Sequence, residues 1–193
     1  MRPERAGERL PRTAGLLLID VQKAIDHLSW GRRNNPRAEE NIGGLLDAWR
    51  ASARPIIHVR HVSREPRSTF RPGQEGCDFK EFTQPKEGEL IIEKHTPNAF
   101  IGTELDVVLR SNRILTLAIV GFITNNSVEA TARMAGNLGY ETLVVSDATA
   151  TFDGEDFEGR FRSAEEIHVM SLANLQGEYA TVLSTEEVLH RAD

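Results

Sequence analysis

Residues 115–147 read LTLAIVGFITNNSVEATARMAGNLGYETLVVSD, and this stretch decides the fold class. An apolar run at 115–121 is followed by a helical pattern at 127–139 and by a second apolar run at 141–147. Gly139 is a suitable end for the helix, because glycine readily adopts the left-handed conformation that stops helices. A strand, a helix and a strand in this order predict a parallel pair of strands joined by a crossover helix.

The same alternation runs through the rest of the chain. Further strands are predicted at 16–21, 55–60, 90–94 and 179–184, and further helices at 35–53, 103–111, 162–177 and 184–192. The strands at 16–21, 55–60 and 115–121 are apolar almost throughout, which is typical of strands covered on both faces. Asn35 and Thr103 are predicted to cap their helices. The sequence therefore predicts an α/β three-layer sandwich, with a six-stranded, mostly parallel sheet and helices on both faces.

Composition limits the function classes. The chain has 193 residues, 39% of them hydrophobic, and a formal net charge of −6, which fits one domain at 15–193 preceded by a flexible tail at 1–14. The acidic balance argues against a nucleic-acid partner. No apolar run approaches the roughly 20 residues of a membrane helix, so no membrane partner is expected either. Cys77 is the single cysteine, which excludes an internal disulfide and favours a cytoplasmic protein.

Polar residues follow three different predicted strands. In open parallel sheets, ligands bind beyond the carboxyl ends of the strands, so Asp20, Lys94 and Ser127 are predicted to converge on one pocket. Taken singly, each has a plainer explanation: Asp20 as a turn residue, Lys94 as a solvated strand end and Ser127 as a helix cap. His58 and His61 lie on opposite faces of an extended chain, and no neighbouring carboxylate completes a ligand set. No metal and no cofactor are therefore predicted.

Three segments together make the pattern specific. They are LLLIDVQ at 16–22, EKHTPNAFIGTELDVVLR at 93–110 and VGFITNNSVEATARMAGNLGYETLVVSDATATF at 120–152. In their order and spacing they resemble the isochorismatase-like cysteine hydrolase superfamily, over roughly residues 15–190. The resemblance implies that Asp20 is the family's acid/base and Lys94 its lysine, and that Ser127 stands where family hydrolases carry a nucleophilic cysteine.

The resemblance also implies details of the site. A non-proline cis peptide bond of the family carries over to Ile123–Thr124, and backbone N–H groups of Ser127 and Asn126 would hold an oxyanion. Nicotinamidases of the superfamily carry an Asp/His metal set around the second strand, which residues 58–68 do not reproduce, so nicotinamide is disfavoured as substrate. A homodimer or homotetramer is implied as well. The residues expected to bind the substrate are Gln22, Ile25, Asn98 and Phe100.

Three functions stay open at this stage. In the first, Ser127 attacks a small amide or related C–N substrate in an Asp-Lys-Ser variant of the Asp-Lys-Cys triad, with Asp20 or Lys94 as base. In the second, Asp20 is the general acid of a vinyl-ether hydrolase of the isochorismatase type. In the third, the pocket binds a small molecule without turnover.

Overall fold

The computed structural model describes residues 9–193, and residues 1–8, which make up most of the predicted tail, lie outside the described residues. Residues 9–14 pack on the domain. Leu10 is buried, its N–H donates to the carbonyl of Arg191 at 2.7 Å, and Ala14 is fully buried. The packed domain therefore includes part of the segment that the sequence assigned to the tail.

One six-stranded sheet forms the middle layer. Its strands are β1 (Gly15–Ile19), β2 (Ile56–His61), β3 (Leu90–Lys94), β4 (Thr116–Phe122), β5 (Glu141–Ala150) and β8 (Thr181–Leu183). Their order across the sheet is β3-β2-β1-β4-β5-β8, and each neighbouring pair is parallel. The predicted fold class is confirmed, because every predicted strand takes its place in this sheet.

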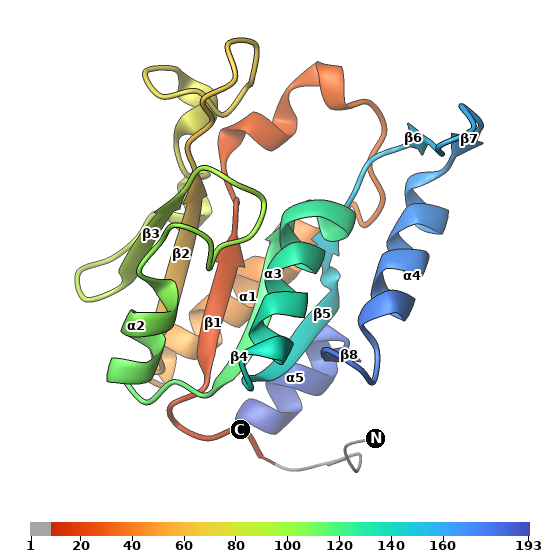
Figure 1. The fold of residues 1–193 in the computed structure, drawn as a ribbon. Coiled ribbons are helices and arrows are strands. Elements are labelled where there is room, and N and C mark those ends of the chain that lie inside the picture. Colours follow the sequence, from red (N-terminus) through yellow and green to blue (C-terminus); the bar gives the residue numbers. More distant parts are fainter. Residues whose placement is uncertain (1–8) are drawn as a thin grey trace.

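Within residues 9–193, five α-helices cover the two faces of the sheet. They are α1 (Ala38–Ala51), α2 (Leu105–Ser111), α3 (Glu129–Asn137), α4 (Ala164–Leu175) and α5 (Thr185–Ala192). Figure 1 shows α1 and α5 on one face and α2, α3 and α4 on the other. Successive residues of β1 alternate between two cores: Leu16 and Leu18 pack with α1, whereas Leu17 and Ile19 pack with α2 and α3. Burial on both sides explains why this strand is apolar throughout.

The helix starts only partly follow the prediction. Ser163 and Ser184 form complete capping boxes with Glu166 and Glu187 at the starts of α4 and α5. Asn35 does not cap α1, which begins after Arg37 without a side-chain cap.

The side chain of Asn35 bonds elsewhere. It donates to the carbonyls of Ser146 and Thr149 at 2.8 and 2.7 Å, and so joins the segment before α1 to β5. Thr103 lies one residue before the helix boundary at Glu104, where its hydroxyl accepts a hydrogen bond from Leu105 N–H.

Several parts of the chain have local structure that the sequence did not predict. Short 3-10 turns follow β1 at Lys23–Asp26 and Leu28–Trp30. The segment 61–88 contains short 3-10 turns at Glu75–Cys77 and Glu81–Thr83. A small antiparallel hairpin, β6 (Gly154–Glu155) and β7 (Phe161–Arg162), projects beyond the body of the domain beside the start of α4 (Figure 1). Strands of two residues leave no periodic pattern to detect, which is why the hairpin was missed.

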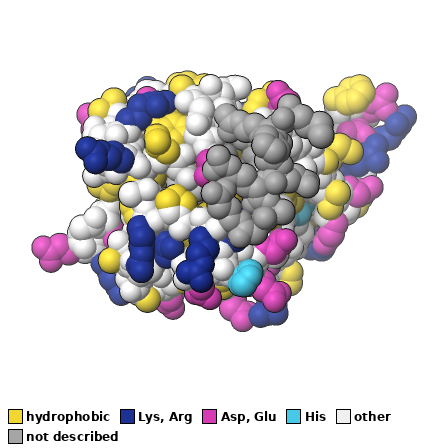
Figure 2. All heavy atoms as spheres, turned by 90° about the horizontal axis from the view of Figure 1, so that it is seen from below, with side chains coloured by type: hydrophobic (Ala, Val, Ile, Leu, Met, Phe, Trp, Pro, Cys, Tyr) yellow, Lys and Arg dark blue, Asp and Glu magenta, His cyan; other side chains and the backbone are white. Residues whose placement is uncertain are grey.

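The two ends of the sheet differ in character. Figure 2 shows the face at the amino ends of the strands, which carries acidic and basic side chains side by side. The polar residues singled out in the sequence lie at the opposite, carboxyl end. None of the helices in residues 9–193 has the length and apolar content needed to cross a membrane.

Gly121 controls how closely β4 approaches β1 near that carboxyl end. Its φ is +115°, and a Cβ at this position would lie 2.1 Å from the carbonyl oxygen of Ile19. Only glycine combines this backbone conformation with so short an approach between strands.

We predict that Gly121→Ala destabilises the fold by about 2–5 kcal/mol, because it adds a backbone clash to an unfavourable φ. Gly44→Ala is the control. A Cβ at Gly44 meets open space on α1, so this variant should gain about 0.5–1 kcal/mol. Urea denaturation measures both changes, and equal effects of the two substitutions would refute the role given to Gly121.

Candidate active site

Asp20 leaves the end of β1 in an unusual backbone conformation. Its φ is +51°, a left-handed conformation that aspartate tolerates better than most residues. Its N–H donates to the carbonyl of Val59 at 3.0 Å, which ties the turn to the neighbouring strand β2. The residue is 3% exposed, so its carboxylate lies inside the protein at the carboxyl edge of the sheet.

Lys94, the last residue of β3, contacts the other two residues that the sequence placed in one pocket, Asp20 and Ser127. It is fully buried, and its Nζ donates to Asp20 Oδ2 at 2.7 Å and to the carbonyl of Thr96 at 3.1 Å. Ser127 Oγ lies 3.3 Å from the same nitrogen. The structure therefore brings a carboxylate, an ammonium and a hydroxyl from distant parts of the chain into direct contact.

The carboxylate of Asp20 has one engaged and one open oxygen. Oδ2 accepts from Lys94, whereas Oδ1 is buried without a hydrogen-bond partner among residues 9–193. Burial raises the pKa of Asp20, and the charge and hydrogen bond of Lys94, with a smaller effect of the neighbouring Ser127 hydroxyl, oppose the rise. A desolvated carboxylate with a free oxygen is a stronger proton acceptor than the same group in water.

Ser127 lies in a single π-helical turn, Thr124–Val128, that leads into α3. The non-proline cis peptide bond is Phe122–Ile123, one bond earlier than the predicted Ile123–Thr124. The predicted role of Asn126 as an oxyanion donor is also corrected. Its N–H donates to the carbonyl of Ile123 at 3.0 Å, so this group is not free to bind an oxyanion. Ser127 N–H stays the predicted donor. The Ser127 side chain does not cap the helix, because it is buried beside Lys94.

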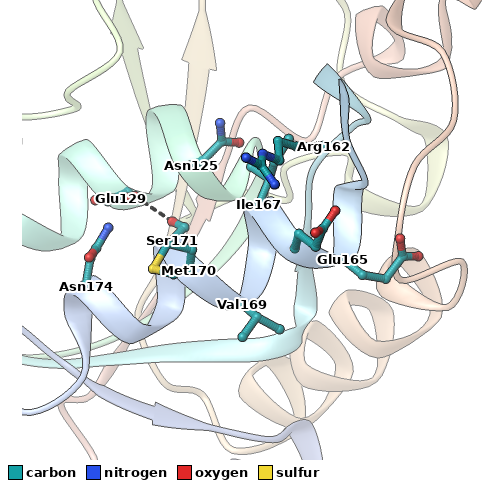
Figure 3. A pocket seen from close by; sticks show the side chains of 10 residues that line it. Asn125, Glu129, Arg162, Glu165, Ile167, Val169, Met170, Ser171 and Asn174 are labelled. Atoms are coloured by element: carbon teal, nitrogen blue, oxygen red, sulfur yellow. Dashed lines mark hydrogen bonds between the residues drawn. The ribbon is translucent and has the colours of Figure 1, made fainter. Parts of the chain in front are cut away.

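Helix α4 holds this turn in place from outside. The hydroxyl of Thr124 lies 2.9 Å from Nδ1 of His168, and Ser171 Oγ, which donates to Glu129 at 2.6 Å (Figure 3), lies 3.3 Å from the carbonyl oxygen of Thr124. Burial lowers the pKa of His168, which favours the neutral ring. Sequence reasoning missed His168 and Ser171, because nothing local to α4 indicates contact with a turn so far back in the chain.

Gln22 and Ile25 belong to the framework around the site. The Gln22 side chain donates to the carbonyls of His61 and Cys77 at 3.0 and 2.8 Å and accepts from His61 N–H at 2.7 Å. Both ends of its amide are thus engaged by backbone, which corrects the expectation that it binds substrate. Ile25 is 2% exposed and lies in the hydrophobic core.

Asn98 and Phe100 also have partners within the chain. Asn98 donates to the carbonyl of Ala130 at 3.0 Å and accepts from Phe100 N–H at 2.8 Å. The Phe100 ring packs on Tyr140, with ring centroids 5.8 Å apart. These contacts fasten the segment after Lys94 onto α3 and onto Tyr140 beyond its end, a structural role that the predicted part in substrate binding did not include.

His61 is the neighbour of Lys94 that sequence reasoning considered only as a metal ligand. Its Nδ1 lies 3.4 Å from Lys94 Nζ, and its ring packs edge-on against Phe70. Burial, together with the positive charge of Lys94, lowers the pKa of His61 to about 4. The ring is therefore neutral at pH 7, so Nδ1 can accept a hydrogen bond from the lysine.

His58 and His61 face different partners. His58 Nε2 lies 2.8 Å from a carboxylate oxygen of Glu89, away from the Lys94 cluster. Within residues 9–193, no three His, Cys, Asp or Glu side chains are grouped as a metal ion would require.

Comparison with known proteins assigns the family. Residues 14–187 match the isochorismatase domain. The isochorismatase family protein YrdC of Bacillus subtilis (strain 168) is 43% identical over 91% of this chain and 94% of its own length. The crystal structure of an isochorismatase-family protein from Chromobacterium violaceum ATCC 12472 superposes with a TM-score of 0.92 at 52% identity, covering 95% of each chain. The chain belongs to the isochorismatase family of hydrolases.

More distant relatives carry the names of particular hydrolases. Nicotinamidase 3 of Arabidopsis thaliana is 26% identical over 92% of this chain and 87% of its own length. A streptothricin hydrolase of Streptomyces noursei is 28% identical over 72% of this chain and 50% of its own length.

The depressed pKa of His61 predicts acid sensitivity. Between about pH 6.5 and pH 4 the unfolded chain binds a proton at this histidine that the folded chain does not, so stability falls as the pH falls through this window. The pKa values of His58 and His168 are lowered as well and act in the same direction. We predict that His61→Gln, which keeps an acceptor for Lys94, reduces the proton uptake on unfolding by up to one proton.

Urea denaturation at several pH values between 4 and 7.5 measures this proton uptake from the slope of the unfolding free energy against pH. A slope in His61→Gln equal to that of the wild type would show that His61 is protonated in the folded protein.

Proposed function

We propose that this protein hydrolyses a small amide or related C–N substrate, with Ser127 as nucleophile in an Asp-Lys-Ser variant of the family's Asp-Lys-Cys triad. The observation that carries the proposal is the contact of Lys94 Nζ with both Asp20 Oδ2 and Ser127 Oγ inside a buried cluster. The names of the relatives, a nicotinamidase and a streptothricin hydrolase, support a family chemistry of hydrolysis.

Asp20 is the proposed base. A serine hydroxyl must lose its proton during attack, and an aspartate of ordinary pKa is a poor acceptor. Burial raises the pKa of Asp20, and Oδ1, which has no hydrogen-bond partner in the described part of the chain, leaves an oxygen available for the proton. The raised pKa and the available oxygen make Asp20 a better proton acceptor than a lone aspartate in water.

Lys94 is the proposed electrostatic partner rather than the base. Its two shortest contacts, Asp20 Oδ2 and the carbonyl of Thr96, are oxygens that only accept, so the lysine serves as a donor to both. An ammonium in this position stabilises the negative charge that moves between Asp20, Ser127 and the substrate.

The reaction then follows in two stages. Ser127 Oγ bonds to the substrate carbonyl carbon while its proton passes to Asp20, and Asp20 returns that proton to the nitrogen as the C–N bond breaks. Water next attacks the resulting ester, gives one proton to Asp20, and releases the acid when that proton returns to Ser127 Oγ. The N–H of Ser127, aided by the positive end of α3, is the proposed oxyanion donor.

One observation favours a second candidate function. A raised pKa also suits Asp20 to act as a general acid, which is the step that a vinyl-ether hydrolase needs. In this route Asp20 protonates the enol carbon, water adds to the cation, and the adduct separates into a carbonyl compound and an alcohol. Ser127 has no covalent part in it.

We predict that Ser127→Ala lowers the turnover of amide substrates at least about 1,000-fold, because it removes the attacking atom. The measurement is product release from a panel of small primary amides, with Ser111→Ala on the exposed surface of α2 as control. Full activity in Ser127→Ala, with vinyl ethers as the substrates that react, would replace the first function by the second.

Ser127→Cys provides the reciprocal test. A thiol is partly ionised at neutral pH, so this variant should hydrolyse the same amides faster than the wild type, and iodoacetamide should inactivate it by alkylating the introduced thiol. An unaltered or lower rate with a correctly folded protein would argue against nucleophilic attack from this position.

Asp20→Asn tests the carboxylate itself. We predict that it abolishes turnover of both amides and vinyl ethers, because asparagine can neither take up nor deliver the proton, whereas Asp47→Asn on exposed α1 changes neither. Calorimetric titration of the same ligands separates chemistry from binding. Wild-type protein that binds these ligands tightly and turns over none would identify a non-catalytic binding protein.

A further inference from the structure

A basic cavity lies at the amino ends of the strands, at the opposite end of the sheet from the candidate active site. The segment before β1, the end of α1 and the end of α5 come together there (Figure 1). The cavity has a volume of about 370 Å³. The described residues that line it, called the arginine cavity here, are Arg9, Leu10, Arg12, Ser52, Arg54, Arg191, Ala192 and Asp193. Arginine is thus concentrated at one place in a chain whose net charge is −6.

Arg54 is the buried member of this group. Its side chain lies against the ring of Trp49, and the residue is only 8% exposed, although arginine is almost never buried unless it is paired. Nη2 donates to the carbonyl of Ala192 at 2.8 Å and to that of Leu10 at 3.5 Å. Nε is buried without a hydrogen-bond partner among residues 9–193. A buried guanidinium with an unsatisfied donor is costly, which points to a partner that binds in the cavity.

Positive charge exceeds negative charge in the arginine cavity. Arg9 donates to the main-chain oxygen of Asp193 at 3.2 Å, and Arg12 donates to the carbonyl of Ser52 at 3.4 Å. A carbonyl orients a guanidinium but does not neutralise it. Even when both the side-chain and the main-chain carboxylate of Asp193 are counted, the four arginines leave an excess of two positive charges. Burial and the charge of Arg12 lower the pKa of Arg54, with Asp193 opposing, as expected where like charges gather.

This combination of charge and shape fits a phosphate group. Guanidinium groups present pairs of N–H donors that match phosphate oxygens. A phosphate monoester carries about −1.5 to −2 charges at pH 7, which balances the excess in the cavity. The cavity has roughly twelve times the volume that one water molecule takes in the liquid, so a bound phosphate group leaves room for a small organic part.

We propose that the arginine cavity binds a phosphate group, either as inorganic phosphate or as part of a small metabolite, with Arg54 as its central donor. The bound anion would join the segment before β1 to the ends of α1 and α5, because each of them contributes an arginine or its neighbour to the cavity. The site lies apart from Asp20 and Ser127, so phosphate binding and hydrolysis can be measured separately.

Isothermal titration calorimetry on the full chain, at constant ionic strength, tests the proposal. Inorganic phosphate and glycerol 3-phosphate are the two probes. At least one should bind to the wild type with a dissociation constant below about 1 mM. Tighter binding of glycerol 3-phosphate identifies a phosphorylated metabolite as the ligand, whereas equal or weaker binding identifies the phosphate group alone. Dissociation constants above this limit for both probes overturn the proposal.

Two variants test the residues of the cavity. Arg54→Lys keeps the charge but loses the planar fork, and Arg12→Gln removes one charge at the exposed rim. Each should weaken phosphate binding at least about tenfold. Arg67→Gln is the matched control, because it removes the same charge from an exposed position in the segment 61–88 and should bind phosphate as the wild type does.

Two outcomes of this comparison contradict the proposal. Unaltered binding in both Arg54→Lys and Arg12→Gln would place the anion elsewhere. Equal weakening in Arg12→Gln and Arg67→Gln would show attraction by net charge rather than a site. Circular dichroism checks that the variants fold, and Arg12→Gln keeps the test valid if Arg54→Lys does not fold.

Urea denaturation gives a second readout that does not depend on a heat of binding. A ligand that binds only the folded chain raises the free energy of unfolding as its concentration rises. Phosphate also stabilises proteins generally, because it is excluded from their surfaces, so the comparison between variants is decisive. Phosphate should raise the urea midpoint of the wild type and of Arg67→Gln by the same amount and that of Arg12→Gln by less. Equal increases in all three proteins would refute a specific site.

Discussion

The buried ion pair between Asp20 and Lys94 is the interaction on which the carboxyl end of this sheet depends. Both groups are almost fully removed from water, and desolvation of two charges costs several kcal/mol unless geometry and further hydrogen bonds offset it. The 2.7 Å contact and the carbonyl of Thr96 supply part of that compensation. A pair of this kind adds little to stability by comparison with packed hydrocarbon, so its presence at the edge of a sheet points to chemistry.

Strand order explains why the cluster forms where it does. The sheet runs β3-β2-β1-β4, and the chain's direction of travel across the sheet changes between β1 and β4. Ligands of open α/β sheets bind at such a switch point, beyond the carboxyl ends of the strands. Asp20 and Ser127 follow the two strands that flank it, whereas Lys94 reaches in from the edge strand β3. The Gln22 side chain binds the backbone of His61 at the end of the intervening strand β2, and so ties the segment after β1 to that strand.

The strands and helices, and the meeting of Asp20, Lys94 and Ser127, could be predicted from the sequence for the same reason. Apolar runs and helical spacing are local signals, and the strand-end rule turns local positions into spatial neighbours once the sheet is known to be parallel. Hydrogen-bond partners are not local. Gln22 follows a strand as Asp20 does, yet its amide binds the backbone of His61 and Cys77, which no pattern near residue 22 encodes. His168 escaped notice for the same reason, since its contact with Thr124 depends on how α4 packs.

The same burial has opposite effects on folding and on the proposed reaction. A desolvated Asp20 costs folding free energy, yet desolvation is what raises its pKa towards the range of a useful base. A cysteine nucleophile asks less of its base than a serine does, because part of the thiol is already ionised at neutral pH. With Ser127 in this position, more of the work of activation falls on the Asp20 carboxylate. Shielding of Asp20 from bulk solvent is then a requirement of the proposed chemistry, which admits water only to attack the ester, and the contacts around the cluster, from Gln22 on one side to α4 on the other, support that proposal as well as the fold.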